Sequence, residues 1–383
     1  MIPGLDGLRA IAFLLVFALH TDYIQIGWVG VQLFFVLSGF LITGILLDMK
    51  QGLKPKEYFV KFYGRRFLRI FPLYYFYLAL MSGITTWLSA ARYRPNYMKL
   101  FSEQVGYALM YVYNFFFASA GYRESKFLDH FWSLSVEEQF YIFWPMLILL
   151  VPEKYLKKLF FAGIIIAPIF RAVLVLVYRL DVPFFRDGAA YVVYPLPFSH
   201  IDAFAFGAYI SRFSIPKARL QFYVLPLLVP ILGFTSYYLA TGELGYLTAL
   251  GFPVVMPRAY QYIWGYSLLN YWFAVIIYCV VRERMLVRFF EWSPLRYLGK
   301  ISYGLYVYHF PIIWFAWRIR DVWSMEESLA MPLTAIISLI ATVIIASLSY
   351  FLMERPILNL KDKYFSREPS AEPAQVQGTA LPG

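Results

Sequence analysis

The chain has 383 residues, of which 61% are hydrophobic, 21% aromatic and 15% charged. A soluble domain is about half apolar and about a quarter charged, and here the apolar residues form long runs, so the composition excludes an ordinary soluble enzyme and indicates an integral membrane protein. The formal net charge of +11 does not indicate nucleic-acid binding, because the lysines and arginines lie in short loops between the apolar runs, as the positive-inside rule expects.

Residue counts and spacing also argue against metal and disulfide chemistry. Cys279 is the single cysteine, which excludes an internal disulfide and a cysteine-based zinc site. No histidine–carboxylate grouping has the spacing of a metal site, and the HExxH pattern is absent. We therefore expect no bound metal. The first apolar run lacks a following cleavage site, so we expect it to be retained as a transmembrane helix.

Apolar runs of about 17–25 residues are long enough to cross a bilayer as helices. The chain has ten such runs, at residues 8–24, 28–47, 70–89, 133–151, 158–179, 195–212, 222–240, 264–281, 300–319 and 330–352. We therefore expect an all-α integral membrane protein with a bundle of about ten transmembrane helices. The run at 106–117 is shorter, which is typical of a re-entrant or interfacial segment.

The basic residues between the runs predict the orientation. With ten spans, five basic stretches fall on one side, at residues 50–69, 154–158, 212–219, 282–300 and 355–367. Basic loops face the cytoplasm, so we expect both termini there. We also expect one transmembrane domain over 1–355, whose last helix is closed by Glu354, Arg355 and Pro356 with a local ion pair, and a cytoplasmic tail over 356–383 that is disordered toward its end.

The first span carries Arg9 near its start and His20 near its far end. They are eleven residues apart (20 − 9 = 11), which is about 20° more than three helical turns and about 16 Å along the axis. They therefore lie on one helix face, and Asp6 is placed to pair with Arg9. Because ionisable groups are costly at membrane depth, the pair looks like two ends of a reaction path, with His20 as a general base. The alternative for His20 is a hydrogen-bonded interfacial residue.

The second span, GVQLFFVLSGFLITG, contains the small residues Gly30, Ser38, Gly39 and Gly44. Small residues allow helices to approach closely, so we expect a packing surface here. No histidine on the same helix is spaced to activate Ser38, which favours packing over a role as nucleophile.

The third span begins with KFYGRRFLRIFP, which places Arg65, Arg66 and Arg69 at the predicted cytoplasmic mouth. Arg66 and Arg69 are three residues apart and share a helix face. Guanidinium groups suit bidentate recognition of phosphate. The alternative is positive-inside anchoring with contacts to lipid headgroups.

The fourth span begins with DHFWSLSVEEQFY, in which two adjacent acids, Glu137 and Glu138, enter an apolar helix. Adjacent positions point about 100° apart, so we expect one acid to face the bundle and the other an aqueous vestibule, where it binds an acceptor or orients a base. The alternative is helix capping, with Ser133 or Ser135 as the N-cap.

His309 lies two residues before Pro311 in YGLYVYHFPII. The proline frees a backbone carbonyl and predicts a kink. His309 either hydrogen-bonds in this region as a structural group or lines the cavity as a substrate-binding residue. His130 and His200 are weaker candidates.

Five segments in this order resemble the membrane acyltransferase-3 family, which contains O-antigen, nodulation-factor and macrolide O-acyltransferases. The segments are GLDGLRAIAFLLVFALH, GVQLFFVLSGFLI, RFLR, FWSLSVEEQFY and ISYGLYVYHFPII. The resemblance implies a ten-helix bundle, acyl-CoA as donor and O-acylation of a carbohydrate or similar hydroxyl. It implies that Arg66 and Arg69 bind the donor's phosphates and that His20 is the transfer residue. Many members carry a further soluble hydrolase-like domain; without one, we expect a second step to need another protein.

Together these patterns predict an O-acyltransferase of the cytoplasmic (inner) membrane with no permanently bound cofactor. The expected donor is acyl-CoA, with acetyl-CoA as the first choice, and the expected acceptor is a carbohydrate, a cell-surface polysaccharide or a lipid-linked glycan, with membrane lipid as a further partner. Candidate residues are His20 and Arg9 for catalysis, Arg65, Arg66 and Arg69 for the donor, and Glu137, Glu138 and His309 for substrate. Two roles for His20 stay open, general base and transient acyl carrier. The rival function is a proton-coupled transporter or a flippase for lipid-linked glycans, with His20 and the acids as a proton relay.

Overall fold

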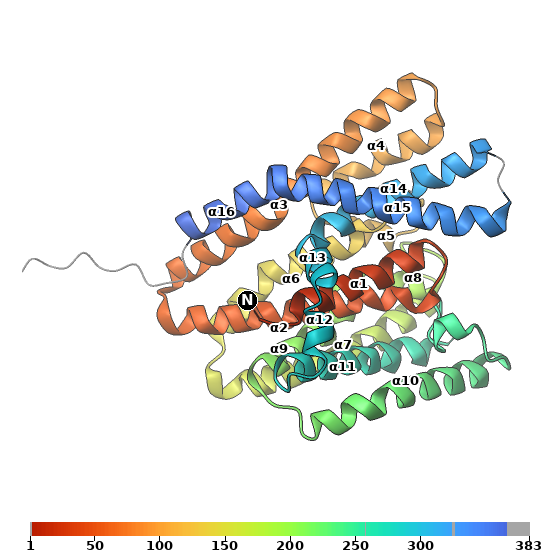
Figure 1. Cartoon of the computed structure of the whole chain (residues 1–383). Coiled ribbons are helices and arrows are strands. Elements are labelled where there is room, and N and C mark those ends of the chain that lie inside the picture. Colours follow the sequence, from red (N-terminus) through yellow and green to blue (C-terminus); the bar gives the residue numbers. More distant parts are fainter. Residues whose placement is uncertain (1, 257, 324–325, 366–383) are drawn as a thin grey trace, which may run out of the picture.

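The computed structural model describes residues 2–256, 258–323 and 326–365. Every named element within these residues is a helix, and the one β contact is an isolated bridge between Ser119 and Phe185. Figure 1 shows the long helices running side by side, up and down one bundle. The all-α prediction is therefore confirmed.

Each of the ten predicted spans falls on a helix of this bundle. These helices are α1 (Leu5–His20), α2 (Val29–Gly52), α3 (Pro55–Ala90), α6 (Phe131–Leu150), α7 (Leu156–Arg179), α9 (Ile201–Arg212), α10 (Ala218–Thr241), α11 (Ala259–Val281), α14 (Ser302–Trp323) and α15 (Glu327–Ser349). Shorter helices connect them, namely α4 (Pro95–Leu109), α5 (Tyr113–Phe117), α8 (Ala189–Val193), α12 (Val287–Phe290) and α13 (Ser293–Lys300).

Within the described residues, six segments are long and apolar enough to cross a membrane, so the predicted count of ten is not confirmed. They are Gln25–Gly52, Pro55–Ala90, Glu153–Arg179, Ala218–Thr241, Gln261–Val281 and Ser328–Lys361. Two of the remaining predicted spans are short, because α1 has 16 residues and α9 has 12, or about 24 Å and about 18 Å at 1.5 Å per residue. A bilayer core is about 30 Å thick, so these two helices do not span it by length alone.

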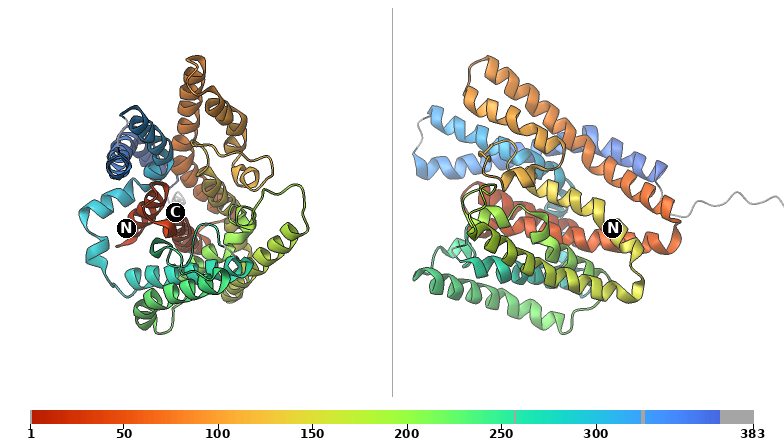
Figure 2. Two further views of the ribbon diagram at one scale, coloured as in Figure 1. Left: turned by 90° about the vertical axis from the view of Figure 1, so that its right-hand side faces the viewer. Right: turned by 180° about the vertical axis from the view of Figure 1, so that it is seen from behind.

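Apolar side chains cover the outward faces of the peripheral helices. On α15, Ile336, Ile340 and Ile344 are exposed at a spacing of four residues, which places them on one helix face. Exposed isoleucines and leucines also mark α7 and α10, whereas α2 is mostly buried. Figure 2 shows α1 and α2, in red, surrounded by the other helices. This pattern is that of a multi-pass membrane protein with a buried central pair.

The predicted basic stretches gather at one end of the bundle, which we call the basic end. Lys50 Nζ donates to the carbonyl of Ile148 at 2.8 Å, just before the second stretch. Arg212 Nη2 lies 3.6 Å from Glu153 Oε2, and Arg219 Nε lies 2.7 Å from Glu283 Oε2. These contacts join loops that are far apart in sequence, as the orientation argument requires. Which side of a membrane this end faces stays a prediction.

The short run at 106–117 is broken in the middle. Helix α4 ends at Leu109, Tyr111 has a left-handed backbone with φ of 53°, and α5 begins at Tyr113. The hydroxyl of Tyr74 on α3 donates to the carbonyl of Ala108 at 2.7 Å and ties this segment to the bundle. The run is therefore not one continuous helix.

Glycines allow the central helices to approach each other closely. A Cβ built at Gly39 on α2 would lie 2.1 Å from the carbonyl oxygen of Phe204 on α9, and one at Gly30 would lie 2.3 Å from that of Ala12 on α1. Gly207 on α9 meets the backbone of α2 in return, at 2.0 Å from the Val36 oxygen. The predicted packing role is confirmed for Gly30 and Gly39 but not for Gly44, which has nothing within 4 Å.

The prediction that Glu354, Arg355 and Pro356 close the last helix is wrong. A π-helical turn over Tyr350–Glu354 leads directly into α16 (Arg355–Tyr364). Pro356 is tolerated because it occupies the first turn of α16, where its missing N–H is not needed. The chain then packs on α3, where Arg65 Nη1 donates to the carbonyl of Phe365 at 2.8 Å. The predicted disordered end, 366–383, lies outside the described residues.

Candidate active site

Two cavities lie inside the bundle, and Val31 and Tyr306 line both of them. The first cavity has a volume of about 100 Å³ and the second about 620 Å³. Arg9 lines the first and His20 lines the second. Helix α1 therefore runs from one cavity to the other, with its two predicted catalytic residues at opposite ends.

We call the first cavity the basic chamber, because three arginines line it. Arg9 comes from α1, and Arg66 and Arg69 come from α3. Asp6 holds Arg9 as predicted, with Arg9 Nη1 donating to Asp6 Oδ1 at 2.9 Å. The guanidinium of Arg66 lies over the ring of Tyr141, 5.2 Å from its centroid. These contacts fix the orientation of two of the three guanidinium groups.

Arg65 lies apart from this group. Its side chain reaches the carbonyl of Phe365, just beyond α16, and it is not among the residues that line the basic chamber. Arg65 points about 100° away from Arg66 but only about 40° from Arg69. Its separation therefore follows from its hydrogen bond to Phe365, one turn nearer the start of α3, and not from the helix period alone. Its predicted role in donor binding gains no support from this position.

The two predicted acids, Glu137 and Glu138 on α6, also line the basic chamber. Glu137 Oε1 accepts hydrogen bonds from the hydroxyls of Ser38 and Tyr141, the second at 2.7 Å. Glu138 is buried, and its Oε1 has no hydrogen-bond partner among the described residues. An unpaired buried carboxylate oxygen is costly, so Glu138 is suited to meet a polar ligand group in the chamber.

The capping alternative for these acids is wrong. Helix α6 begins at Phe131 with His130 as its N-cap residue and no side-chain cap. The hydroxyl of Ser133 donates to the His130 carbonyl at 3.0 Å, and that of Ser135 to the Phe131 carbonyl at 3.0 Å. Both serines therefore bond backward into the first turn instead of capping it.

We call the second cavity the histidine chamber, because His20 and His130 line it. Aromatic side chains form much of its wall, and charged groups stand among them: Trp28, Trp132, Tyr191, Tyr194, Trp314, Trp317, Asp22, Glu124, Lys126, Asp129 and Arg318. Flat apolar rings beside charged and hydrogen-bonding groups suit a ligand with both apolar faces and hydroxyls.

Asp129 lies in the loop before α6 and is a buried acid of this chamber. Burial raises its pKa to about 7. Hydrogen bonds from the Ser125 amide at 2.8 Å and the Tyr113 hydroxyl at 3.1 Å partly offset that effect, because they favour the charged form. The carboxyl group therefore changes charge near neutral pH.

His309 is fully buried on α14 and lines neither chamber. Its Nε2 lies 2.8 Å from Nδ1 of His20, and its Nδ1 lies 2.7 Å from the carbonyl oxygen of Tyr306. It thus contacts His20 rather than the cavity, and its predicted substrate-binding role gains no support.

His130 uses the backbone group that Pro311 releases. A proline cannot donate to the carbonyl four residues earlier, which here is that of Val307. His130 Nε2 lies 3.1 Å from this oxygen. The carbonyl that Pro311 is expected to free is therefore found, and the histidine that uses it is His130; the kink stays a prediction.

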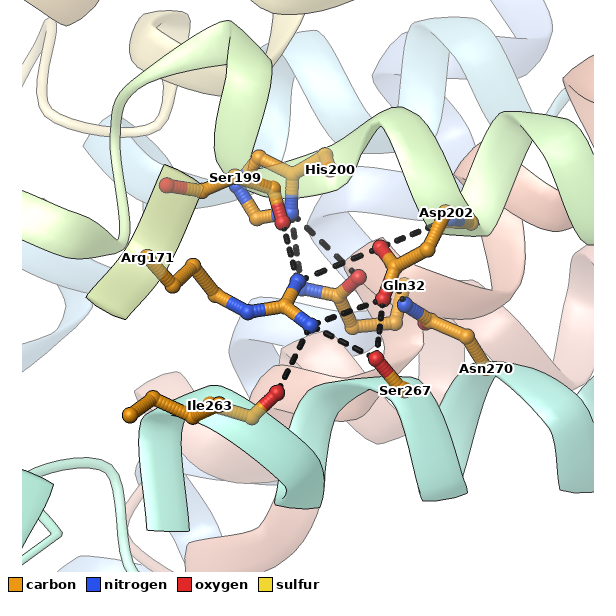
Figure 3. A network of polar contacts seen from close by, with 9 residues as sticks. Gln32, Arg171, Ser199, His200, Asp202, Ile263, Ser267 and Asn270 are labelled. Atoms are coloured by element: carbon orange, nitrogen blue, oxygen red, sulfur yellow. Dashed lines mark hydrogen bonds and ion pairs between the residues drawn. The ribbon is translucent and has the colours of Figure 1, made fainter. Parts of the chain in front are cut away.

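A second polar network contains residues that the sequence patterns did not single out (Figure 3). Arg171 on α7 and Asp202 on α9 are both 0% exposed, and Arg171 Nη2 lies 2.9 Å from Asp202 Oδ2. His200 stands beside them, with Nε2 2.6 Å from the carbonyl of Tyr194, a residue of the histidine chamber's wall. The one sequence signal was a charged residue inside each of two apolar runs.

Comparison with known proteins identifies the family. A family model for an acyltransferase domain, Acyl_transf_3, matches residues 2–351. The peptidoglycan O-acetyltransferase OatA of Listeria monocytogenes is 29% identical over 93% of this chain and 56% of that protein. The O-acetyltransferase OatA of Staphylococcus aureus (strain MRSA252) is 27% identical over 99% of this chain and 61% of that protein.

The chain thus spans little more than half the length of these curated relatives. No solved structure matches it. The family model covers nearly all of the described residues, including both chambers. The chain therefore belongs to the Acyl_transf_3 family of acyltransferases, as its five ordered motifs indicated.

Proposed function

We propose that this chain is a membrane O-acyltransferase that moves an acyl group, acetyl in the first instance, from acyl-CoA to a hydroxyl of a carbohydrate at the cell surface. One observation carries the proposal: α1 places Arg9 in a chamber with two further arginines and His20 in an adjoining aromatic chamber. Both relatives are named O-acetyltransferases, which supports acetyl as the group, and one is named for peptidoglycan, which supports a glycan as the acceptor.

The basic chamber suits the nucleotide end of the donor. Arg66 and Arg69 lie on one face of α3, with Arg69 exposed and Arg66 half-buried. Guanidinium groups make planar, charge-assisted contacts with phosphate oxygens. Since the chamber also holds Glu137 and Glu138, their carboxylates would limit how far the phosphates enter it. Glu137 is already engaged by Ser38 and Tyr141.

The acyl-bearing arm of the donor would then extend along α1 past Arg9 to His20, about 16 Å further along the helix axis. It would pass between Val31 and Tyr306, which line both chambers. The Tyr306 hydroxyl is 2.6 Å from that of Ser133. The side chain of Tyr306 must therefore move for the arm to pass. Val31 and Tyr306 together form the partition between the donor and the acceptor.

In the histidine chamber, His20 would take the proton from an acceptor hydroxyl as that oxygen attacks the thioester carbonyl carbon. The carbon–sulfur bond breaks, and the departing CoA thiolate takes up the proton from the imidazolium. In the alternative order, the His20 nitrogen attacks the thioester carbon first and expels the CoA thiolate. The acceptor hydroxyl then attacks the acyl-imidazole, the acyl–nitrogen bond breaks, and the thiolate takes up the hydroxyl proton. The aromatic wall, with Trp132 and Trp314, suits the apolar faces of sugar rings.

We further propose that the basic end faces the cytoplasm in a bundle of about ten spans, since the basic loops gather there. Acyl-CoA would enter from that side, and the acceptor from the other side of the cytoplasmic membrane. The transporter alternative is less well supported, because Glu137 and Glu138 share one chamber with three arginines and do not form a chain of acids leading to His20.

Mass spectrometry of surface glycans from cells with and without this chain tests the proposal. We expect acyl esters on a surface carbohydrate that disappear when the chain is deleted and return with the wild-type chain but not with His20→Ala. Identical glycan profiles in all four strains, with the protein present in the membrane, would contradict it.

A further inference from the structure

A chain of two hydrogen bonds ends on the ring of His20. The carbonyl oxygen of Tyr306 lies 2.7 Å from His309 Nδ1, and His309 Nε2 lies 2.8 Å from His20 Nδ1. The two imidazole rings are nearly parallel, with 15° between their planes and 5.0 Å between their centroids. His309 is fully buried, while His20 is half-buried and lines the histidine chamber.

The direction of each hydrogen bond follows from the first acceptor. A backbone carbonyl only accepts, so His309 Nδ1 must carry the proton in the 2.7 Å contact with Tyr306. In a neutral imidazole, the other nitrogen then holds a lone pair. His309 Nε2 is therefore an acceptor, and His20 Nδ1 must be the donor to it. The lone pair of His20 is left on Nε2, the nitrogen that His309 does not occupy.

Packing holds this arrangement in place. The ring of Phe13 meets that of His309 edge-on, at 5.8 Å between centroids and 90° between planes. Phe310 meets His20 edge-on at 4.7 Å and 72°. Neither ring can turn without displacing an aromatic neighbour, so the pairing of nitrogens is fixed by the bundle and not by a substrate.

We propose that His309 is the positioning residue of the reaction: it holds His20 with the proton on Nδ1, so that Nε2 is the nitrogen presented to the acceptor. The inference rests on the proposed function, in which His20 takes a proton or an acyl group. When His20 Nε2 takes up a proton, the Nδ1–H bond to His309 strengthens. In many enzymes the attacking hydroxyl and the catalytic base are accompanied by a third group that orients the base. Here that third group is a neutral histidine.

Kinetics of His309 variants test the role. His309→Phe keeps a ring of similar size but cannot accept from His20, so we expect kcat for acetyl transfer to fall about 10²–10⁴-fold, the usual contribution of a general base. His309→Gln has an amide oxygen that can accept from Nδ1–H, and we expect it to recover part of that loss. The KM for acetyl-CoA should stay unchanged in both variants, because His309 lies outside the basic chamber.

A spectroscopic measurement decides the proposal without any reaction. The sequence has four histidines, so ¹⁵N-histidine labelling of the full chain, purified in detergent through a tag without histidine, gives a simple NMR spectrum. His20→Ala assigns the His20 signals. We expect wild-type His20 to carry its proton on Nδ1, and His309→Phe to shift the proton wholly or partly to Nε2.

The outcomes separate this inference from the proposed function. A wild-type His20 with its proton on Nε2 overturns the inference, as does a folded His309→Phe variant with wild-type kcat. If His20→Ala retains transfer, the proposed function fails, whatever the tautomer is. If His309→Phe does not fold, the tautomer of wild-type His20 and the kinetics of His309→Gln still test the inference. A folded His309→Gln variant that recovers no transfer also contradicts the positioning role.

Discussion

Loss of the Asp202 carboxylate should destabilise the bundle strongly, because it would leave a buried guanidinium without its counter-ion. Arg171 donates to both carboxylate oxygens, at 3.2 and 2.9 Å, and both side chains are 0% exposed. Ser267 adds a further hydrogen bond to Oδ2 at 2.6 Å, and Asn270 one to Oδ1 at 3.1 Å. Figure 3 shows Arg171 of α7 and Ser267 and Asn270 of α11 around Asp202 of α9.

The size of the effect follows from the cost of an unpaired buried charge. Removing one partner of a buried ion pair costs about 3–5 kcal/mol, so Asp202→Leu should lower the free energy of unfolding by about that amount. Arg171→Met in the same chain removes the orphaned charge, and the double variant should recover much of the loss. The two substitutions are therefore expected to be strongly non-additive, as residues in one network are.

Unfolding in mixed micelles, followed by circular dichroism, measures these free energies. Glu283→Gln is the matched control: Arg219 Nε lies 2.7 Å from Glu283, but the arginine side chain is 70% exposed. Exposed pairs contribute about 0–1 kcal/mol. If Asp202→Leu costs no more than Glu283→Gln, or if the double variant is the sum of the single ones, the reasoning about buried charge is refuted.

Three further predictions concern the two chambers. Arg69→Ala should weaken acetyl-CoA binding about 10- to 150-fold, the equivalent of a charge-assisted contact of about 1.5–3 kcal/mol, and Arg69→Lys should weaken it less. Titration calorimetry in nanodiscs measures both affinities. Equal affinities in wild type and both variants would mean that Arg69 sets only the membrane orientation. Val31→Trp should block the passage between the two chambers, so that acetyl-CoA still binds but acyl transfer is lost. Val31→Ala should retain transfer, and an active Trp variant would place the donor's path elsewhere. Burial raises the pKa of Asp129 to about 7 from 3.8, so the folded chain binds the proton more tightly than the unfolded chain. Stability should therefore fall as pH rises from about 4 to about 7. Asp129→Asn should remove that part of the pH dependence of Tm, and an unchanged dependence of Tm on pH would contradict the burial argument.

Local features of the site could be predicted from the sequence because helix geometry is local. The period of an α-helix places Arg9 and His20 on one face and Asp6 beside Arg9, and the structure has that arrangement. The same period does not exclude Arg65 from the chamber, because Arg65 lies only about 40° from Arg69. Its contact with Phe365, 300 residues away in the chain, decides its position.

Long-range pairing could not be predicted from a single chain. His20 and His309 are 289 residues apart, and Arg171 and Asp202 are 31 apart. Each looks like an isolated polar residue in an apolar run, and no local rule says which partner it meets. The end of α15 has a different cause: a π-helical turn at Tyr350–Glu354 leads into α16, and no pattern in the sequence marks such a turn.

Acyl transfer by the purified chain tests the central claim most directly. Wild type and His20→Ala, reconstituted in nanodiscs, would be given radiolabelled acetyl-CoA and a soluble N-acetylhexosamine oligosaccharide, with acetyl-CoA affinity measured in parallel. We expect labelled, ester-linked product with wild type and a loss of about 10²–10⁴-fold with His20→Ala, while both proteins bind acetyl-CoA equally. Equal product formation by the two proteins would contradict the assignment of His20 as the residue that performs the transfer.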